Sequence, residues 1–294
     1  MIEISGYDFA YMEPITKGWS KDKKFCVTNT DGTKYLLRIT AIERYEEIKS
    51  LFEMLRQVGA LGVPMCNPVA VGTCDAGAYS LFSWIDGEDL NVVLPFLSET
   101  EQYKLGIQAG AALRKIHSLP APANDEDCMA HIIRGMKENI EKYKSCGVQF
   151  PSDLDVITYA ENNAYLAQSR PQTFQHGDFS VGNIMIENGE IRIIDFDYSY
   201  GDPWQDFESI RWTVDKSKYF ATGQIKGYFG GDAPENFWTL LKLYLAQGCF
   251  HNIPWSVNTG DKEQIESSVR HARDIVEWFD DFKTTEPTWY LSNS

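Results

Sequence analysis

Three polar side chains in the second half of the chain have the types and spacing that phosphoryl transfer requires. Asp178 is followed by Asn183 five residues later and by Asp195 twelve residues after that. Moving a phosphoryl group from a nucleotide to an alcohol needs a carboxylate that orients the hydroxyl and accepts its proton, and hard oxygen ligands that hold Mg²⁺ against the phosphates. We therefore expect Asp178 to be the catalytic base, and Asn183 and Asp195 to bind the metal.

The sequence between Asn183 and Asp195 predicts a short β-hairpin. Residues 183–186 and 191–194 form two apolar-rich runs, and the Glu-Asn-Gly-Glu segment between them is a turn signal. Such a hairpin would bring the two side chains to adjacent strand ends, within reach of one ion. A loop with a capping Asp and a buried Asn would explain each residue alone, but it does not explain the whole set.

The segment from residue 176 to 207 resembles the aminoglycoside phosphotransferase and choline kinase-like superfamily of small-molecule kinases. Three stretches carry the resemblance: His-Gly-Asp with Asn five residues after the Asp, then Ile-Asp-Phe, then Gly-Asp-Pro-x-x-Asp-Phe. A weaker match is the helix that ends in Leu-x-x-Ile-His at residues 113–117. Protein kinases share the loop Asp and Asn, but they carry H-R-D, D-F-G and A-P-E motifs. This chain has His-Gly-Asp and Asp-Phe-Asp instead, which favours the small-molecule branch.

The resemblance implies an α+β fold of the two-lobed protein-kinase-like type, with a small N-terminal sheet lobe and a larger, mainly helical C-terminal lobe. We place the boundary at the Asp86-Gly87 turn, so that residues 1–86 form the nucleotide-binding lobe and 87–294 the catalytic and substrate-binding lobe. Local patterns agree with this division. Strands are expected at 25–28, 35–39, 69–72 and 79–85, and helices at 43–58, 101–117, 129–146, 154–168, 205–214, 234–249 and 262–282.

The same resemblance implies a nucleotide site in the first lobe. Arg38 stands where the family has a lysine on the third strand, and its planar guanidinium can hold phosphate through two hydrogen bonds. Ser20 lies in the turn of residues 15–21 that should cover the phosphates. The rival source of the positive charge is Lys17, Lys21 or Lys24, in the hairpin around this turn. Ser83 and Ile85, between the lobes, should contact the adenine edge through their backbone groups.

A glutamate on the helix of residues 43–58 should orient Arg38. Loop-length counting favours Glu47, whereas alignment to the family motif F-E-x-L favours Glu53, and both remain candidates. The expected cofactors are Mg²⁺ and ATP, with GTP as the alternative nucleotide.

Three other motif residues are expected to have structural roles. His176 should hold the loop in place through a hydrogen bond to the backbone, and Gly177 should give the turn an unusual backbone angle. Asp206 is expected to be a helix cap or a charge partner for Arg211.

Composition limits the classes of protein that the chain can belong to. Its 294 residues are 43% hydrophobic, which is enough for one large or two modest domains. The six scattered cysteines form no C-x-x-C pair, which indicates reduced thiols. No apolar run approaches a membrane span or a leader, so we expect a soluble cytoplasmic protein without a membrane partner. The net charge of −15 disfavours nucleic-acid binding and suits a cationic substrate.

These observations lead to the hypothesis of a Mg²⁺-dependent O-phosphotransferase acting on a small-molecule hydroxyl, most similar to the aminoglycoside kinases. The acceptor would be an aminosugar, and antibiotic resistance the corresponding role. The same chemistry also fits another alcohol, such as choline, homoserine, methylthioribose or a macrolide, because the pocket and not the fold selects the acceptor. A third hypothesis, motivated by Arg38, is a nucleotide-binding protein without turnover. The chain is expected to be a monomer or a homodimer.

Overall fold

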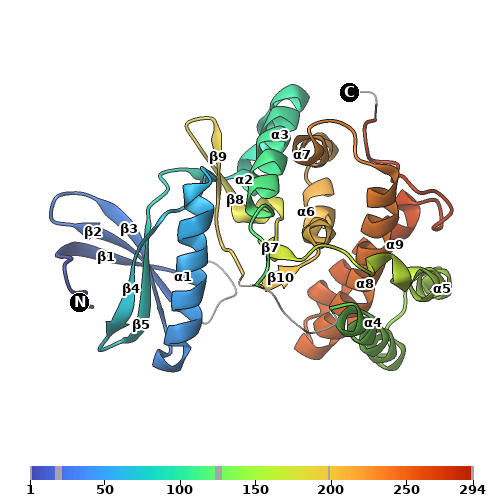
Figure 1. Ribbon diagram of the computed structural model, residues 1–294, viewed down its shortest axis with the longest axis horizontal. Coiled ribbons are helices and arrows are strands. Elements are labelled where there is room, and N and C mark those ends of the chain that lie inside the picture. Colours follow the sequence, from blue (N-terminus) through green and yellow to red (C-terminus); the bar gives the residue numbers. More distant parts are fainter. Residues whose placement is uncertain (1, 17–21, 123–127, 198, 293–294) are drawn as a thin grey trace. The chain divides into compact units, whose positions relative to one another are not determined.

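The computed structural model describes residues 2–16, 22–122, 128–197 and 199–292 (Figure 1). These residues divide into two compact units. The first contains the chain up to Val93 together with the segment that begins at Asn183, and the second contains Leu94–Gly182 and the chain from Ser199 onward. The Asn183 hairpin therefore belongs with the N-terminal unit. Assigning residues 1–86 to nucleotide binding and 87–294 to catalysis remains a prediction.

The first unit is built on a five-stranded antiparallel sheet in the order β1-β2-β3-β5-β4. Helix α1 packs on β4 and β5 and buries Phe52, Leu55 and Val58 (Figure 1). Strand β1 was not predicted, and the other four strands and the helix were. The bounds are β1 Phe9–Ile15, β2 Lys23–Asn29, β3 Lys34–Thr40, α1 Tyr45–Ala60, β4 Pro68–Cys74 and β5 Gly77–Ser83.

A second, three-stranded sheet of the first unit contains the predicted hairpin. Its order is β6-β8-β9, and the N–H of Ile193 also donates to the carbonyl of Pro64 at 2.8 Å. This bond attaches the hairpin to the segment that precedes β4. The bounds are β6 Glu88–Asp89, α2 Leu90–Val93, β8 Ile184–Glu187 and β9 Glu190–Ile193.

The second unit is mainly helical. Helix α3 begins with a capping box, in which Ser98 and Glu101 satisfy one another's backbone N–H groups. The family expectation of a kinase-like fold, with a sheet unit and a larger helical unit, is confirmed. The bounds are α3 Glu99–Ile116, α4 Cys128–Ser145, α5 Asp153–Asn163, β7 Thr173–Gln175, β10 Ser199–Gly201, α6 Ile210–Val214, α7 Lys218–Phe229, α8 Glu235–Thr259 and α9 Lys262–Trp278.

Helices α3 and α7 approach each other closely through four glycines. Gly106 and Gly110 of α3 face Gly223 and Gly227 of α7, and a Cβ on any of them would overlap the backbone of the other helix. The close approach brings the C-terminal ends of both helices into the interior, where His117 and Tyr228 are buried. These glycines therefore fix the position of two polar side chains that belong to the site below.

We predict that Gly110→Ala destabilises the protein by about 1–3 kcal/mol, because the added methyl group overlaps the backbone of Gln224 and forces the helices apart. Gly135 of α4 is the matched control, since a Cβ there meets no atom within 4 Å. Gly135→Ala should instead stabilise by roughly 0.5–1 kcal/mol through helix propensity. Denaturant unfolding of both variants measures the difference, and equal effects would contradict the packing argument.

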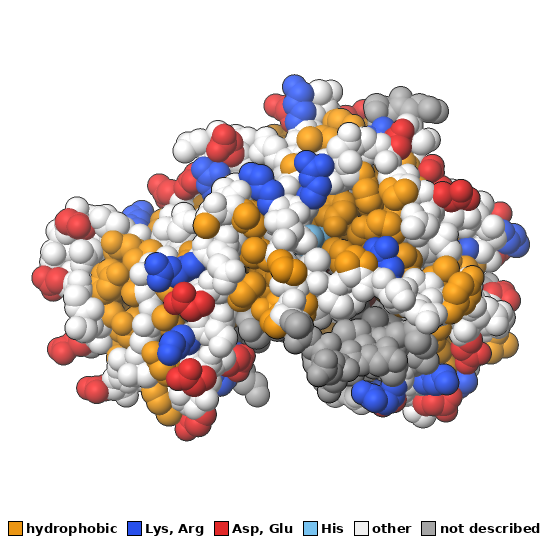
Figure 2. Space-filling model, viewed as in Figure 1, with side chains coloured by type: hydrophobic (Ala, Val, Ile, Leu, Met, Phe, Trp, Pro, Cys, Tyr) orange, Lys and Arg blue, Asp and Glu red, His pale blue; other side chains and the backbone are white. Residues whose placement is uncertain are grey.

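No helix among the described residues is both long and apolar enough to cross a membrane. Acidic and basic side chains are interspersed on the face of the molecule in Figure 2. On that face, the net negative charge of the chain is therefore spread out and does not form one large acidic patch.

Candidate active site

The hairpin ends in the first unit bring together the two predicted metal ligands. Ile184 pairs with Ile193, and the N–H of Ile194 donates to the carbonyl of Asn183 at 3.0 Å. Asn183 and Asp195 therefore lie at adjacent strand ends, at the open end of the hairpin, as the sequence predicted. Asp195 has φ +60°, a conformation that residues other than glycine rarely adopt, and its side chain is 47% exposed.

Arg38 reaches this end of the hairpin from strand β3. Its Nη1 lies 2.9 Å from Asp195 Oδ1, and its Nη2 lies 3.2 Å from Asp22 Oδ2. Arg38 is thus held between two carboxylates, one of which is the predicted metal ligand. A guanidinium in this position is suited to binding phosphate oxygens beside a metal ion.

Asp22 is the residue that sequence reasoning missed. Its side chain is only 12% exposed, and it accepts from Arg38 through one oxygen and from Arg44 Nη1, at 3.4 Å, through the other. Arg44 in turn binds Glu47 at 2.6 Å and holds the pKa of that carboxyl below its ordinary value through their hydrogen bond. Asp22 lies close to Arg38 because strands β2 and β3 pair Lys24 with Arg38. This pairing could have identified Asp22 only if the register of the two strands had been known.

The other predicted nucleotide contacts stay predictions. Glu53 pairs with Arg56 at 3.9 Å, while Glu47 is linked to Arg38 through Arg44 and Asp22. In β5, the Ser83 N–H donates to the carbonyl of Asn67 at 2.8 Å, and the Ser83 hydroxyl accepts from the Asn67 N–H at the same distance. Ile85 is buried. Ser20 lies outside the described residues.

Cys66 is a buried thiol of the first unit. Burial raises its pKa to about 12, and the charges of Arg38 and Asp195 both act on it. A thiol that stays protonated at neutral pH is a weak nucleophile. Cys66 is therefore a packing residue beneath the site.

In the second unit, the carboxylate of Asp206 holds the start of the loop that carries Asp178. It accepts the backbone N–H groups of His176 at 2.7 Å and Gly177 at 2.8 Å, and the Nε2–H of His117 at 2.9 Å. Gly177 has φ +89°, which confirms the predicted turn. The expectation that Asp206 caps a helix or pairs with Arg211 is wrong, because its oxygens are used by the loop and by His117.

The same contacts set the charge state of Asp206. Burial alone would raise its pKa, but the hydrogen bond and the charge of His117 hold the pKa below its ordinary value, with His176 contributing in the same direction. On the other side of the ring, the Nδ1 of His117 lies 3.0 Å from the Tyr228 hydroxyl. The buried, charged carboxylate of Asp206 therefore holds the start of the Asp178 loop in place.

The remaining loop contacts leave the Asp178 side chain at the surface. Asp178 donates its backbone N–H to His176 Nδ1 at 3.3 Å, and Val181 donates to Thr213 Oγ1 at 3.1 Å. His176 and Phe179 are buried in an edge-to-face contact, while Asp178 is exposed. The structural role predicted for His176 is consistent with these contacts.

Asp202 has a purely structural environment in the second unit. It binds Arg170 through both oxygens, at 2.6 and 3.0 Å, accepts from the Tyr244 hydroxyl at 2.6 Å and caps the 3₁₀ helix at Trp204. The helix cap expected at Asp206 is thus formed by Asp202. Arg211, the other expected partner of Asp206, pairs with Glu208 at 2.6 Å.

The donor set at the hairpin end suits Mg²⁺. Asn183 and Asp195 offer amide and carboxylate oxygens, which are the hard ligands that this ion prefers. Within the described ranges, no three His, Cys, Asp or Glu side chains form a cluster that could hold an ion by themselves. Mg²⁺ at this position would take further ligands from phosphate and water oxygens, as is usual for this ion.

Three features define the class of phosphoryl-transferring enzymes. They are a kinase-like fold, an exposed loop aspartate, and a hairpin end with Asn, Asp and a neighbouring cation. The family model of the phosphotransferase enzyme family matches residues 12–238. The chain belongs to this family and is a phosphotransferase. No curated protein sequence matches the chain significantly.

Solved structures support the fold. A choline/ethanolamine kinase family protein from Mesorhizobium loti superposes with a TM-score of 0.66 at 18% identity, over 95% of this chain and 92% of that one. The GDP complex of aminoglycoside 2′-phosphotransferase-IIIa gives 0.71 at 14% identity, over 91% and 93% of the two chains. Spectinomycin phosphotransferase, solved with ADP and spectinomycin, gives 0.66 at 14% identity, over 91% and 90%.

We predict that Asp22→Asn weakens nucleotide binding about tenfold, because Arg38 loses one of the two carboxylates that hold its guanidinium. Titration calorimetry with Mg·ATP measures the dissociation constant. Glu53→Gln is the control, since Glu53 pairs only at long range with Arg56 on the surface. Weaker binding in Glu53→Gln with no change in Asp22→Asn would assign the supporting role to the helix glutamate.

We also predict that Asp206→Asn destabilises the protein by about 3–5 kcal/mol at pH 7, since the amide cannot replace a buried, paired carboxylate. Because the folded-state pKa of Asp206 lies below its unfolded value, the stabilisation is present above the unfolded pKa and is lost as the pH falls through the folded pKa. The gap between wild type and variant in denaturant unfolding should therefore narrow in acid. A gap that stays constant with pH would contradict the charged state assigned to Asp206.

Proposed function

We propose that the protein transfers the γ-phosphoryl group of ATP to a hydroxyl of a small molecule, and that the acceptor is a polyhydroxylated amine of the aminoglycoside type. The observation that carries this proposal is the Asp178, Asn183 and Asp195 set in a member of the phosphotransferase family. GTP is the alternative donor, since a neighbour of the same fold was solved with GDP.

Each residue of the set has one role in the proposed reaction. Asp178 orients the acceptor hydroxyl and accepts its proton while the oxygen attacks the γ-phosphorus. The new oxygen–phosphorus bond forms as the bond to the β–γ bridging oxygen breaks, and ADP leaves. The proton passes from Asp178 to solvent. Catalysis comes mainly from alignment and from stabilisation of the charge that develops on the phosphoryl oxygens.

The first unit supplies the groups that hold the nucleotide. Asn183 and Asp195 would bind Mg²⁺, which neutralises phosphate charge when it is present. Arg38 would contact the α- and β-phosphates, and Asp22 would keep its guanidinium in place. The replacement of lysine by arginine motivated a hypothesis of binding without turnover. The position of Arg38 beside Asp195 instead supports a working phosphate contact.

We predict that Asp178→Asn lowers kcat by roughly 10²–10⁴-fold and changes nucleotide affinity little, because the carboxylate acts on the acceptor proton. A coupled ADP-release assay against aminoglycosides and metabolite alcohols measures turnover, and calorimetry measures binding. Asp75→Asn, at an exposed turn, is the matched control and should behave as wild type.

Two results would change the proposal. Equal losses of kcat and nucleotide affinity in Asp178→Asn would remove Asp178 from the role of base. Nucleotide binding without ADP release for any acceptor would favour the protein without turnover, and release with choline alone would change the acceptor class.

A further inference from the structure

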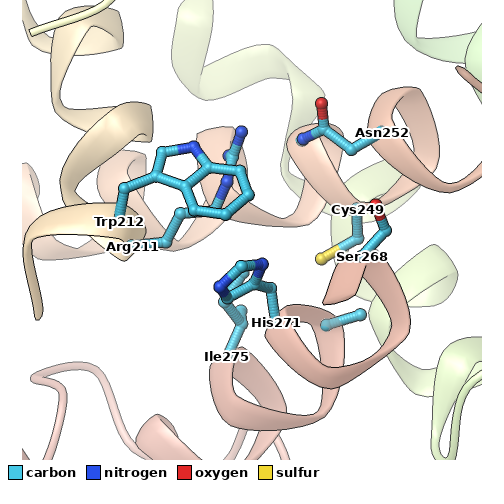
Figure 3. A pocket seen from close by; sticks show the side chains of 9 residues that line it. Arg211, Trp212, Cys249, Asn252, Ser268, His271 and Ile275 are labelled. Atoms are coloured by element: carbon cyan, nitrogen blue, oxygen red, sulfur yellow. The ribbon is translucent and has the colours of Figure 1, made fainter. Parts of the chain in front are cut away.

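A small cavity in the second unit is lined by helices α6, α8 and α9 (Figure 3). Its volume is about 10 Å³, which is room for one water-sized group. Trp212 and Arg211 enter from α6, His271 from α9, and Cys249 and Asn252 from α8. None of the residues predicted from the sequence to form the site lies in it.

His271 gives this cavity its chemical character. Its side chain is 6% exposed, and Nε2 lies 2.7 Å from Asp215 Oδ2. Nδ1 is fully buried and has no hydrogen-bond partner among the described residues. In the tautomer whose Nε2–H donates to the Asp215 carboxylate, Nδ1 presents a lone pair. A buried acceptor that lacks a donor is destabilising, so we expect a hydrogen-bond donor to bind in the cavity.

Arg211 is the one Lys or Arg side chain among the described residues that line the cavity, and its charge is already neutralised. The Arg211 guanidinium binds Glu208 at 2.6 Å, and a Cβ on Gly248 would overlap both side chains. The glycine thus makes room for the ion pair. Trp212 contacts His271 edge to face at 4.1 Å between ring centres and is 39% exposed, which places an aromatic surface next to solvent.

Negative charge prevails around His271. Burial raises the pKa of Asp274, and the neighbouring carboxylates of Asp215 and Glu277 raise it further. Such surroundings disfavour an anionic group and favour a neutral or cationic hydrogen-bond donor.

Helix α6 links this cavity to the catalytic loop. Trp212 is followed directly by Thr213, which is fully buried and accepts the N–H of Val181 at 3.1 Å. Val181 lies three residues after Asp178 in the same loop. A molecule anchored beside Trp212 would therefore be held by the helix that also positions the proposed base.

We propose that the cavity at His271 anchors one hydrogen-bond-donating group of the phosphoryl acceptor, either a hydroxyl or an ammonium group. This inference rests on the proposed function and narrows its substrate class. The acceptor must carry a donor in addition to the hydroxyl that is phosphorylated. Polyhydroxylated amines meet this requirement, whereas choline has a single hydroxyl and no N–H group.

The test is steady-state kinetics of His271→Phe, which keeps a ring against Trp212 and removes Nδ1. The acceptor is whichever of gentamicin, spectinomycin, hygromycin B and choline the wild type phosphorylates best. The KM for this acceptor should rise about tenfold, with the KM for ATP and the slow hydrolysis of ATP by water unchanged. His251→Phe, on the exposed side of α8, is the matched control and should leave the acceptor KM unchanged.

A second variant, Asp215→Asn, keeps the test valid if His271→Phe fails to fold. The Asp215 side chain is 33% exposed, so we expect this substitution to be tolerated. It removes the charge that fixes the Nε2 proton and should raise the acceptor KM by a smaller factor. An acceptor KM unchanged in both variants would mean that the cavity holds only an ordered water, and would overturn the inference while the proposed function stands. Choline as the best substrate would overturn it as well. A wild type that phosphorylates no acceptor would overturn both.

Discussion

The buried carboxylate of Asp206 is the constraint on which the loop of the predicted catalytic base depends. A charge in the interior is tolerated only when its acceptor sites are filled, and here two loop N–H groups and the His117 imidazole fill them. His117 is in position because glycines let α3 and α7 pack backbone to backbone. Helix packing, a buried charge and the direction of the Asp178 loop therefore form one causal chain.

The first unit depends on a different arrangement, a row of side chains with alternating charges. Asp195, Arg38, Asp22, Arg44 and Glu47 follow one another, each within 3.4 Å of the next. The row joins the hairpin end to the sheet and to α1. Because Arg38 and Asp22 are partly shielded from water, their pairing is stronger than that of ordinary surface ion pairs.

The sequence was most informative where the pattern is local. The hairpin of residues 184–193 and the periodic helices could be predicted because turn residues and spacing define them. Helix α7 was missed because Phe220–Tyr228 are all buried, and a helix buried on every side has no amphipathic period. The partners of Asp206 and Arg38 could not be predicted, since His117 lies 89 residues from Asp206 and Asp22 approaches Arg38 only through strand register. Contacts between distant segments are set by packing, which one sequence does not display.

The most direct test of the account is to follow the γ-phosphoryl group itself. The protein would be incubated with Mg·ATP labelled in the γ-phosphate and with polyhydroxylated amines, and the acceptors analysed by mass spectrometry. The account predicts one labelled phosphate ester on the acceptor for each ADP formed. Label found only in inorganic phosphate, with every acceptor unmodified, would contradict it.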